Sequence, residues 1–124
     1  LNEITTLLHE NGYQTQIETS GTFEIKTHPS TWVTLSPKYG KSIKSNYEVL
    51  KTSYERANEI KYPVGKLLDI ENLKYLINKN KLFKKIIWLQ PLSTNIKATE
   101  LCTEMAMKHN WRLSLQTHKF INLR

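Results

Sequence analysis

Apolar and polar positions alternate along this chain with two different periods, and each period predicts a different kind of element. Spacing of three to four residues predicts a helix in the opening segment, which stops at Asn11-Gly12, and two further helical stripes. These stripes run through Tyr47, Leu50, Tyr54 and Ala57, and through Ala98, Leu101, Cys102, Met105 and Ala106. A fourth helix is expected from Asp69, as its N-cap, to about Ile77. Strands are expected at residues 13–19, 31–35, 59–64, 84–90 and 112–116.

Strands that alternate with helices predict parallel βαβ units, so the fold class is α/β. The 124 residues fit one domain. A complete parallel (β/α) barrel needs about 250 residues, so this chain is expected to supply part of one. The opening helical pattern starts at Leu1 without an N-cap residue, and we therefore expect the sequence to be part of a longer protein.

Polar residues follow four of the expected strands, at positions 18–22, 36–38, 90–93 and 116–119. Ligands of parallel α/β folds bind beyond the carboxyl ends of the strands, where these segments lie. Amides and hydroxyls dominate there. This composition predicts a polar organic ligand with amino, carboxylate and ribose groups, and it does not suit a metal cage.

A formal net charge of +7 raises the alternative of a basic module that binds nucleic acid. Fifteen of the 18 basic residues are Lys and three are Arg, beside abundant Asn and Ile, as an AT-rich coding sequence would produce. A solvated basic surface is therefore favoured, and direct nucleic-acid binding is not expected. The Lys79, Lys81, Lys84 and Lys85 cluster is interpreted as solvated surface.

The single cysteine, Cys102, lies in an apolar stripe and is expected to pack in the core. One cysteine forms no internal disulfide, and the chain has no CxxC motif that could hold zinc or an iron–sulfur cluster. The longest apolar runs fall far short of the roughly 20 residues that span a bilayer. The expectation is therefore a cytoplasmic protein without a membrane partner.

Several segments, in order, resemble the C-terminal half of the 7-carboxy-7-deazaguanine synthase family. They are Gln16-Ile17-Glu18-Thr19-Ser20-Gly21-Thr22, Trp32-Val33-Thr34-Leu35-Ser36-Pro37-Lys38, Tyr47-Glu48-Val49-Leu50, Glu55-Arg56-Ala57-Asn58-Glu59-Ile60-Lys61, Leu89-Gln90-Pro91 and Trp111-Arg112-Leu113-Ser114-Leu115-Gln116-Thr117-His118-Lys119. The similarity covers essentially the whole chain. It implies the C-terminal part of an incomplete barrel of the radical S-adenosylmethionine (SAM) type.

The resemblance also implies an enzyme of queuosine biosynthesis, a tRNA modification pathway. Members of this lyase family convert 6-carboxy-5,6,7,8-tetrahydropterin into 7-carboxy-7-deazaguanine with loss of ammonia, using SAM, a [4Fe-4S] cluster and Mg²⁺, and they form homodimers. The family's CxxxCxxC cluster motif and its Mg²⁺ ligand belong to the N-terminal half, which is absent from this sequence, so no metal ligand is expected here.

Site residues follow from the resemblance position by position. Ser36, Pro37 and Lys38 match the Ser-Pro-Lys segment that binds SAM, and Gln90, Pro91, Leu92 and Ser93 match a second SAM-contacting turn. Glu18 and Ser20 are further candidates for the same ligand. Arg124, through the terminal carboxylate, and His118 are candidates for binding the pterin, and no catalytic residue is assigned.

Two alternatives stay open at this point. The chain could be a basic α/β module that binds RNA or protein without catalysis, or an inactive truncated relic of the enzyme. Binding that weakens steeply with added salt would favour the nucleic-acid module.

Overall fold

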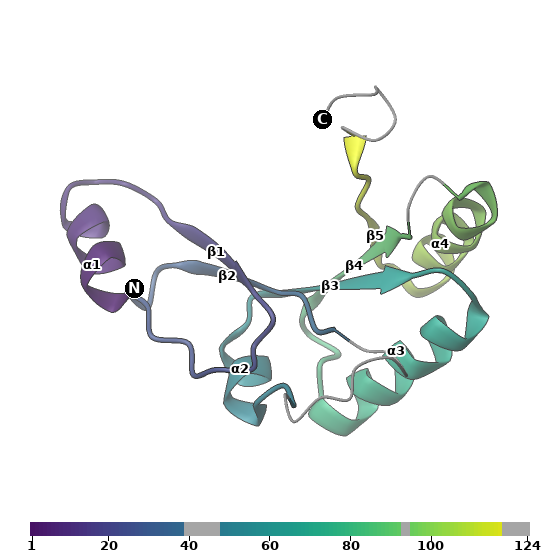
Figure 1. The fold of residues 1–124 in the computed structure, drawn as a ribbon, viewed down its shortest axis with the longest axis horizontal. Coiled ribbons are helices and arrows are strands. Elements are labelled where there is room, and N and C mark those ends of the chain that lie inside the picture. Colours follow the sequence, from purple (N-terminus) through teal and green to yellow (C-terminus); the bar gives the residue numbers. More distant parts are fainter. Residues whose placement is uncertain (39–47, 93–94, 118–124) are drawn as a thin grey trace. The chain divides into compact units, whose positions relative to one another are not determined.

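The computed structural model describes residues 1–38, 48–92 and 95–117, and these residues form two compact units, Leu1–Ile60 and Lys61–Arg124 (Figure 1). The first unit holds α1 (Asn2–Glu10), β1 (Gln16–Thr19), β2 (Trp32–Leu35) and α2 (Lys51–Arg56). The strand β3 (Glu59–Val64) begins in the first unit and ends in the second. The second unit continues with α3 (Leu67–Asn80), β4 (Ile86–Pro91), α4 (Ile96–His109) and β5 (Arg112–Leu113).

The described strands form one sheet in the order β1-β2-β3-β4-β5, and every pair whose register is resolved is parallel. In the first unit β2 lies between β1 and β3, with Glu18 opposite Thr34 and Leu35 opposite Ile60. In the second unit Leu89 of β4 lies opposite Leu113 of β5. The prediction of a parallel α/β fold is confirmed.

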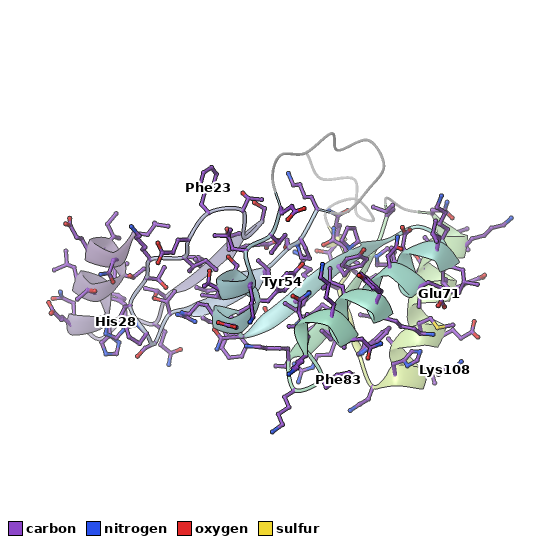
Figure 2. All side chains as sticks on the ribbon, turned by 90° about the horizontal axis from the view of Figure 1, so that it is seen from below. Phe23, His28, Tyr54, Glu71, Phe83 and Lys108 are labelled. Atoms are coloured by element: carbon purple, nitrogen blue, oxygen red, sulfur yellow. The ribbon has the colours of Figure 1, made fainter. Side chains whose placement is uncertain are left out.

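The first unit is held together by a core on one face of its strands. Val33, Leu35 and Ile60 are fully buried, and Tyr54 of α2 packs in the same unit (Figure 2). Because β2 alternates, Thr34 points to the opposite face from these apolar side chains. The guanidinium of Arg56 closes the loop before β2 by donating to the backbone oxygen of Thr31 at 2.8 Å and to that of His28 at 3.3 Å.

The second unit packs its helices against its own strands. Its fully buried side chains come from β3, α3, β4 and α4 and include Val64, Ile70, Leu73, Leu89, Ala98 and Cys102. The side chain of Asn95 caps α4, because its Oδ1 accepts hydrogen bonds from the backbone N–H of Lys97 at 2.9 Å and of Ala98 at 3.3 Å. The predicted apolar stripe on this helix is confirmed.

Several predicted boundaries are wrong for identifiable local reasons. The strand expected from residue 13 begins at Gln16, because the N–H of Tyr13 instead bonds to the Leu8 oxygen at the end of α1. The strand expected from residue 84 begins at Ile86, because the N–H of Lys85 closes a turn onto the Leu82 oxygen at 3.0 Å. The last strand ends at Leu113, three residues before the expected end.

Two expected helices also differ from the observed ones. α2 begins only after Leu50, and Tyr47 lies outside the described residues. Asp69 is not the N-cap of α3, which is Lys66. Asp69 lies one turn further along, and its Oδ2 accepts from the N–H of Lys66 at 3.0 Å and of Gly65 at 2.8 Å. It satisfies amide groups at the helix start, as a capping residue does, from inside the helix.

Gly21 allows the loop after β1 to lie against the rest of the first unit. Its φ is +75°, and a Cβ placed there would overlap the Leu35 Cδ1 atom and lie 3.1 Å from side-chain atoms of Ser53 and Val49. The Gly21 oxygen in turn accepts hydrogen bonds from Ser53 Oγ at 2.9 Å and from the Leu50 N–H at 3.0 Å. No L-residue with a side chain fits this position without displacing its neighbours.

Gly21→Ala is expected to lower the free energy of unfolding by about 2–4 kcal/mol, because a strained backbone and overpacking add together. The matched control is Gly12→Ala, since Gly12 has φ +82° and a Cβ there meets nothing within 4 Å. The control is expected to cost about 1 kcal/mol. Urea unfolding of the native polypeptide that carries residues 1–124 measures both, and equal losses would contradict the packing argument.

Candidate functional site

The carboxyl ends of β1 and β2 bring together two of the predicted site residues in the first unit. Ser36 Oγ donates a hydrogen bond to Glu18 Oε1 at 2.6 Å, the short distance typical of a hydroxyl bound to a carboxylate. The parallel register produces this pair, because Ser36 lies one residue beyond the Thr19–Leu35 match and its N–H donates to the Thr19 oxygen at 2.8 Å.

The residues that flank this pair differ in exposure. Pro37 is buried and fixes the chain directly after β2, whereas Lys38 is exposed. Its ammonium therefore stays hydrated at the edge of the sheet and is available to an anionic group. Ser20 lies in the loop after β1, where its hydroxyl is 3.3 Å from that of Thr22.

A second group of polar side chains lies deeper on the same face of the first unit. Thr34 Oγ1 accepts a hydrogen bond from Gln16 Nε2 at 2.9 Å and donates one to Glu59 Oε1 at 2.6 Å. With Glu18, these side chains form a polar face across three neighbouring strands. Gln16, Thr34 and Glu59 were not predicted as part of this face. Their spacing was a usable signal, because polar residues two positions apart in a strand point to the same face of the sheet.

The predicted turn of the second unit lies at the carboxyl end of β4. Gln90 is half-buried, Pro91 is buried, and Leu92 keeps 48% of its surface exposed. The Leu92 N–H donates to the Val64 oxygen at 2.9 Å, which ties this turn to the end of β3. Ser93, His118 and Arg124 lie outside the described residues.

Two residues that the sequence analysis did not assign to the site hold this turn in place. A Cβ on Gly65 would lie 2.8 Å from Leu92 Cδ1, so only glycine leaves the Leu92 side chain where it is. Asp69 Oδ2 fixes the Gly65 N–H at 2.8 Å. From the sequence, Gly65 could be recognised only as the residue that ends a strand. Its contact with Leu92 could not be predicted, because Leu92 lies 27 positions further along the chain.

Cys102 is a core residue, as predicted. It is fully buried on α4, and burial, followed by the negative charge of Asp69, raises the pKa of its thiol to about 11. Among the residues that the structure describes, no group of three or more His, Cys, Asp and Glu side chains is placed to hold a metal ion. No helix in the described ranges is long and apolar enough to cross a membrane.

At the carboxyl ends of the strands, the first unit carries a carboxylate, a hydroxyl and an ammonium, and the second unit carries an amide. The carboxylate–hydroxyl pair of Glu18 and Ser36 offers an acceptor and a hydroxyl for a ribose, and the amide of Gln90 offers both a donor and an acceptor. Lys38 offers a positive charge for a carboxylate. A cluster needs several thiolates, and the chain has a single, buried cysteine.

A parallel sheet with helices, and with polar side chains at the carboxyl ends of its strands, places this chain in the α/β class. The structure is similar to the crystal structure of QueE from Escherichia coli, with a TM-score of 0.85 and 49% sequence identity over 94% of this chain and 50% of that chain. Scanning against protein-family models gives no match.

Curated relatives give the same result. The chain is 50% identical over 121 residues to 7-carboxy-7-deazaguanine synthase of Escherichia coli strain K12, covering 97% of this chain and 53% of the relative. It is 46% identical over 125 residues to the synthase of Buchnera aphidicola subsp. Schizaphis graminum, covering 54% of that protein. The resemblance to the 7-carboxy-7-deazaguanine synthases is therefore confirmed, and the chain spans about half the length of these relatives.

Cys102 is expected to resist alkylation in the folded protein, because a buried thiol with a pKa of about 11 is almost never a thiolate at pH 8. Mass mapping of the peptide that contains Cys102, after iodoacetamide treatment of the native polypeptide, measures this directly. The same treatment in urea is the control and should label the residue fully. Equal labelling in both conditions would contradict the burial of this thiol.

Proposed function

We propose that this chain is the part of a 7-carboxy-7-deazaguanine synthase that supplies one wall of the SAM and substrate site. The reaction is the conversion of 6-carboxy-5,6,7,8-tetrahydropterin into 7-carboxy-7-deazaguanine with loss of ammonia. The observation that carries the proposal is the Glu18–Ser36 pair at the carboxyl ends of β1 and β2. It occurs in a chain whose sequence is 50% identical to a curated synthase over 121 residues.

Each residue of this edge has a role that its chemistry supports. Lys38 would pair with the carboxylate of SAM, and the Glu18 carboxylate, aligned by the Ser36 hydroxyl, would accept a hydrogen bond from the ribose. Gln90 would bind polar groups through its amide, and the exposed Leu92 would contact an apolar or planar part of the ligand. Pro37 and Pro91 keep the two segments rigid, and Ser20 and Ser93 are further candidates.

When bound, SAM together with a [4Fe-4S] cluster would supply the radical chemistry of the reaction. The residues of this chain bind and orient the SAM moiety, and they shield the reacting carbon from water. The cluster and Mg²⁺ ligands are proposed to lie in the half of the relatives that this chain does not span. His118 and the terminal carboxylate of Arg124 are proposed to bind the pterin.

We further propose a cytoplasmic homodimer, on the resemblance to the synthase family. A small-molecule substrate accords with the enzyme names of the relatives. The alternative of an inactive relic predicts the opposite result from the synthase: SAM would have no effect on turnover or on stability.

Lys38→Met in the native polypeptide that carries residues 1–124 is expected to raise the KM for SAM about 10- to 100-fold, because a hydrogen-bonded charge pair contributes about 1.5–3 kcal/mol. The assay follows formation of 7-carboxy-7-deazaguanine under anaerobic conditions with a reconstituted cluster.

Lys108→Met is the matched control, because Lys108 is exposed in the last turn of α4, which lies before β5 and so at the amino ends of the strands. This variant should keep the KM of the parent protein. If both variants behave alike, Lys38 has no role in SAM binding, and if the parent protein forms no product, the proposed reaction is wrong.

A further inference from the structure

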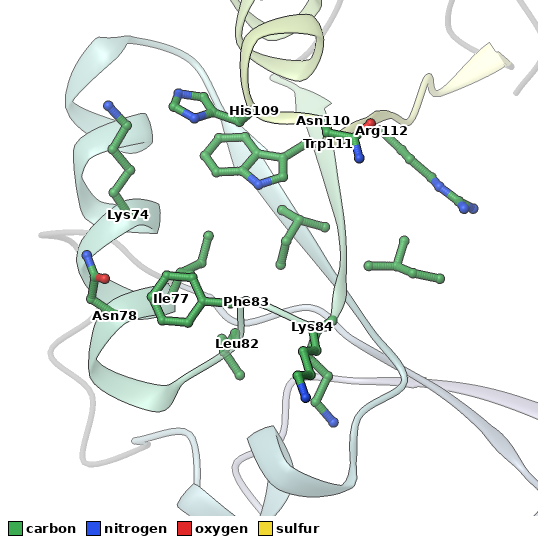
Figure 3. Close-up of a pocket in the computed structure, with 13 residues that line it drawn as sticks. Lys74, Ile77, Asn78, Leu82, Phe83, Lys84, His109, Asn110, Trp111 and Arg112 are labelled. Atoms are coloured by element: carbon green, nitrogen blue, oxygen red, sulfur yellow. The ribbon is translucent and has the colours of Figure 1, made fainter.

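A cavity of about 620 Å³ lies in the second unit (Figure 3). It lies at the start of β4, whereas Gln90 lies at the end of this strand. It is lined by the segment that enters β4, by the segment that enters β5 and by the last turns of α3. These are the amino ends of the strands, so the cavity is separate from the candidate SAM residues at the carboxyl ends. Its volume falls in the range of about 300–1,000 Å³ that small-molecule sites occupy.

The lining of this cavity is basic. Lys74, Lys84, Lys85 and Arg112 contribute positive charge, and none of the 13 lining residues is acidic. Lys74 lies on α3 and is paired with Glu71 at 3.4 Å. The ends of α3 and α4 favour nearby cations through their carbonyl dipoles, which accounts for a basic residue in each last turn.

The other cations are not explained by the helix ends. Lys84 and Lys85 precede β4, and Arg112 begins β5, so all three lie outside the two helices. They line one cavity only in the folded chain, since 27 positions separate Lys85 from Arg112. Lys84 is exposed, in keeping with its interpretation as solvated surface, and it also lines the cavity.

Aromatic side chains line the same cavity. The rings of His109 and Trp111 are stacked, with centroids 4.4 Å apart and planes 24° apart. Phe83 projects from the opposite side and leaves 69% of its surface exposed (Figures 2 and 3). Exposed aromatic faces beside a cavity provide surfaces on which a planar ring can stack.

His109 adds a buried polar atom. Its Nε2 has no hydrogen-bond partner within the part of the chain that the structure describes. Burial, together with Lys74 and Lys108, lowers the pKa of the ring from 6.5, and Glu71 opposes this shift only partly. The imidazole is therefore mainly neutral at pH 7, and an unpaired buried nitrogen gains from a polar ligand group.

We propose that this cavity binds a nucleotide, with the base stacked on an aromatic ring of the lining, Trp111 or Phe83, and the phosphate attracted by the basic side chains, among them Lys84 and Arg112. A nucleotide combines the planar ring and the anionic group that this lining complements. A free nucleoside phosphate and a nucleotide of a single-stranded RNA share this chemistry, and the test distinguishes them. The proposal does not depend on the proposed synthase activity.

The test uses the native polypeptide that carries residues 1–124, with GMP, guanosine and a short single-stranded RNA as probes, measured by isothermal titration calorimetry. GMP should bind saturably and at least about tenfold more tightly than guanosine, because the phosphate adds charge-assisted hydrogen bonds. The double variant Lys84→Glu/Arg112→Glu should weaken GMP binding about tenfold or more.

Two controls separate this site from other effects. The double variant Lys51→Glu/Lys97→Glu makes the same charge change at two exposed positions in the first turns of α2 and α4, outside the lining, and should leave GMP binding within about twofold. Lys38→Met should also leave GMP binding unchanged, so failure of the SAM proposal and failure of this one are distinguishable.

The outcome decides both the site and its ligand. Binding of GMP that only the cavity variant weakens supports a free-nucleotide site. Binding of the RNA alone, with the same dependence on the cavity residues, supports the site and identifies a nucleic acid as the ligand source. No saturable binding of any probe, or equal weakening by the cavity and control variants, would overturn the proposal.

Discussion

The position of the candidate site depends on the register of β2 between its two neighbours. Asn58 holds this register from the β3 side, because its Oδ1 accepts from the Val33 N–H at 2.8 Å while its own N–H donates to the Val33 oxygen at 2.9 Å. A shift of one residue would exchange the two faces of the strand. Val33 and Leu35 would leave the core, and Thr34 would lose Glu59.

The same register separates packing from chemistry in the first unit. Apolar residues of β2 and β3 fill the core on one face, and the other face carries hydrogen-bonded polar side chains that end in the Glu18–Ser36 pair. In the second unit, two polar surfaces are separated along the strands, at their opposite ends. Gln90 and Leu92 lie at the carboxyl end of β4, and the basic cavity lies at its amino end. One short strand therefore positions two surfaces with different side-chain chemistry.

The fold class and the elements could be predicted from the sequence, because periodicity reports which face of each element is buried. The bounds of Glu59–Val64 are as predicted, and the stripe through Ala98, Cys102 and Met105 is buried on α4. Boundaries were wrong where one backbone hydrogen bond decides them, as at Tyr13 and Lys85. Such hydrogen bonds depend on the conformation of the turn, which the pattern of apolar and polar residues does not encode directly.

The candidate site was only partly predictable, for a related reason. Strand-end position and the family resemblance identified Glu18, Ser36 and Lys38, and the structure pairs the first two of them. Gly65 and Glu59 were missed because their roles arise from contacts with residues distant in sequence. The cavity was missed for the same reason, since its cations come from separate segments.

The central claim is that these residues work as part of a radical SAM synthase. The most direct measurement is the intact mass of the native polypeptide, together with iron and sulfide analysis after anaerobic reconstitution. The account predicts a mass well above 14.6 kDa and about four irons per chain. A mass equal to that of these 124 residues, with no bound iron, would contradict it.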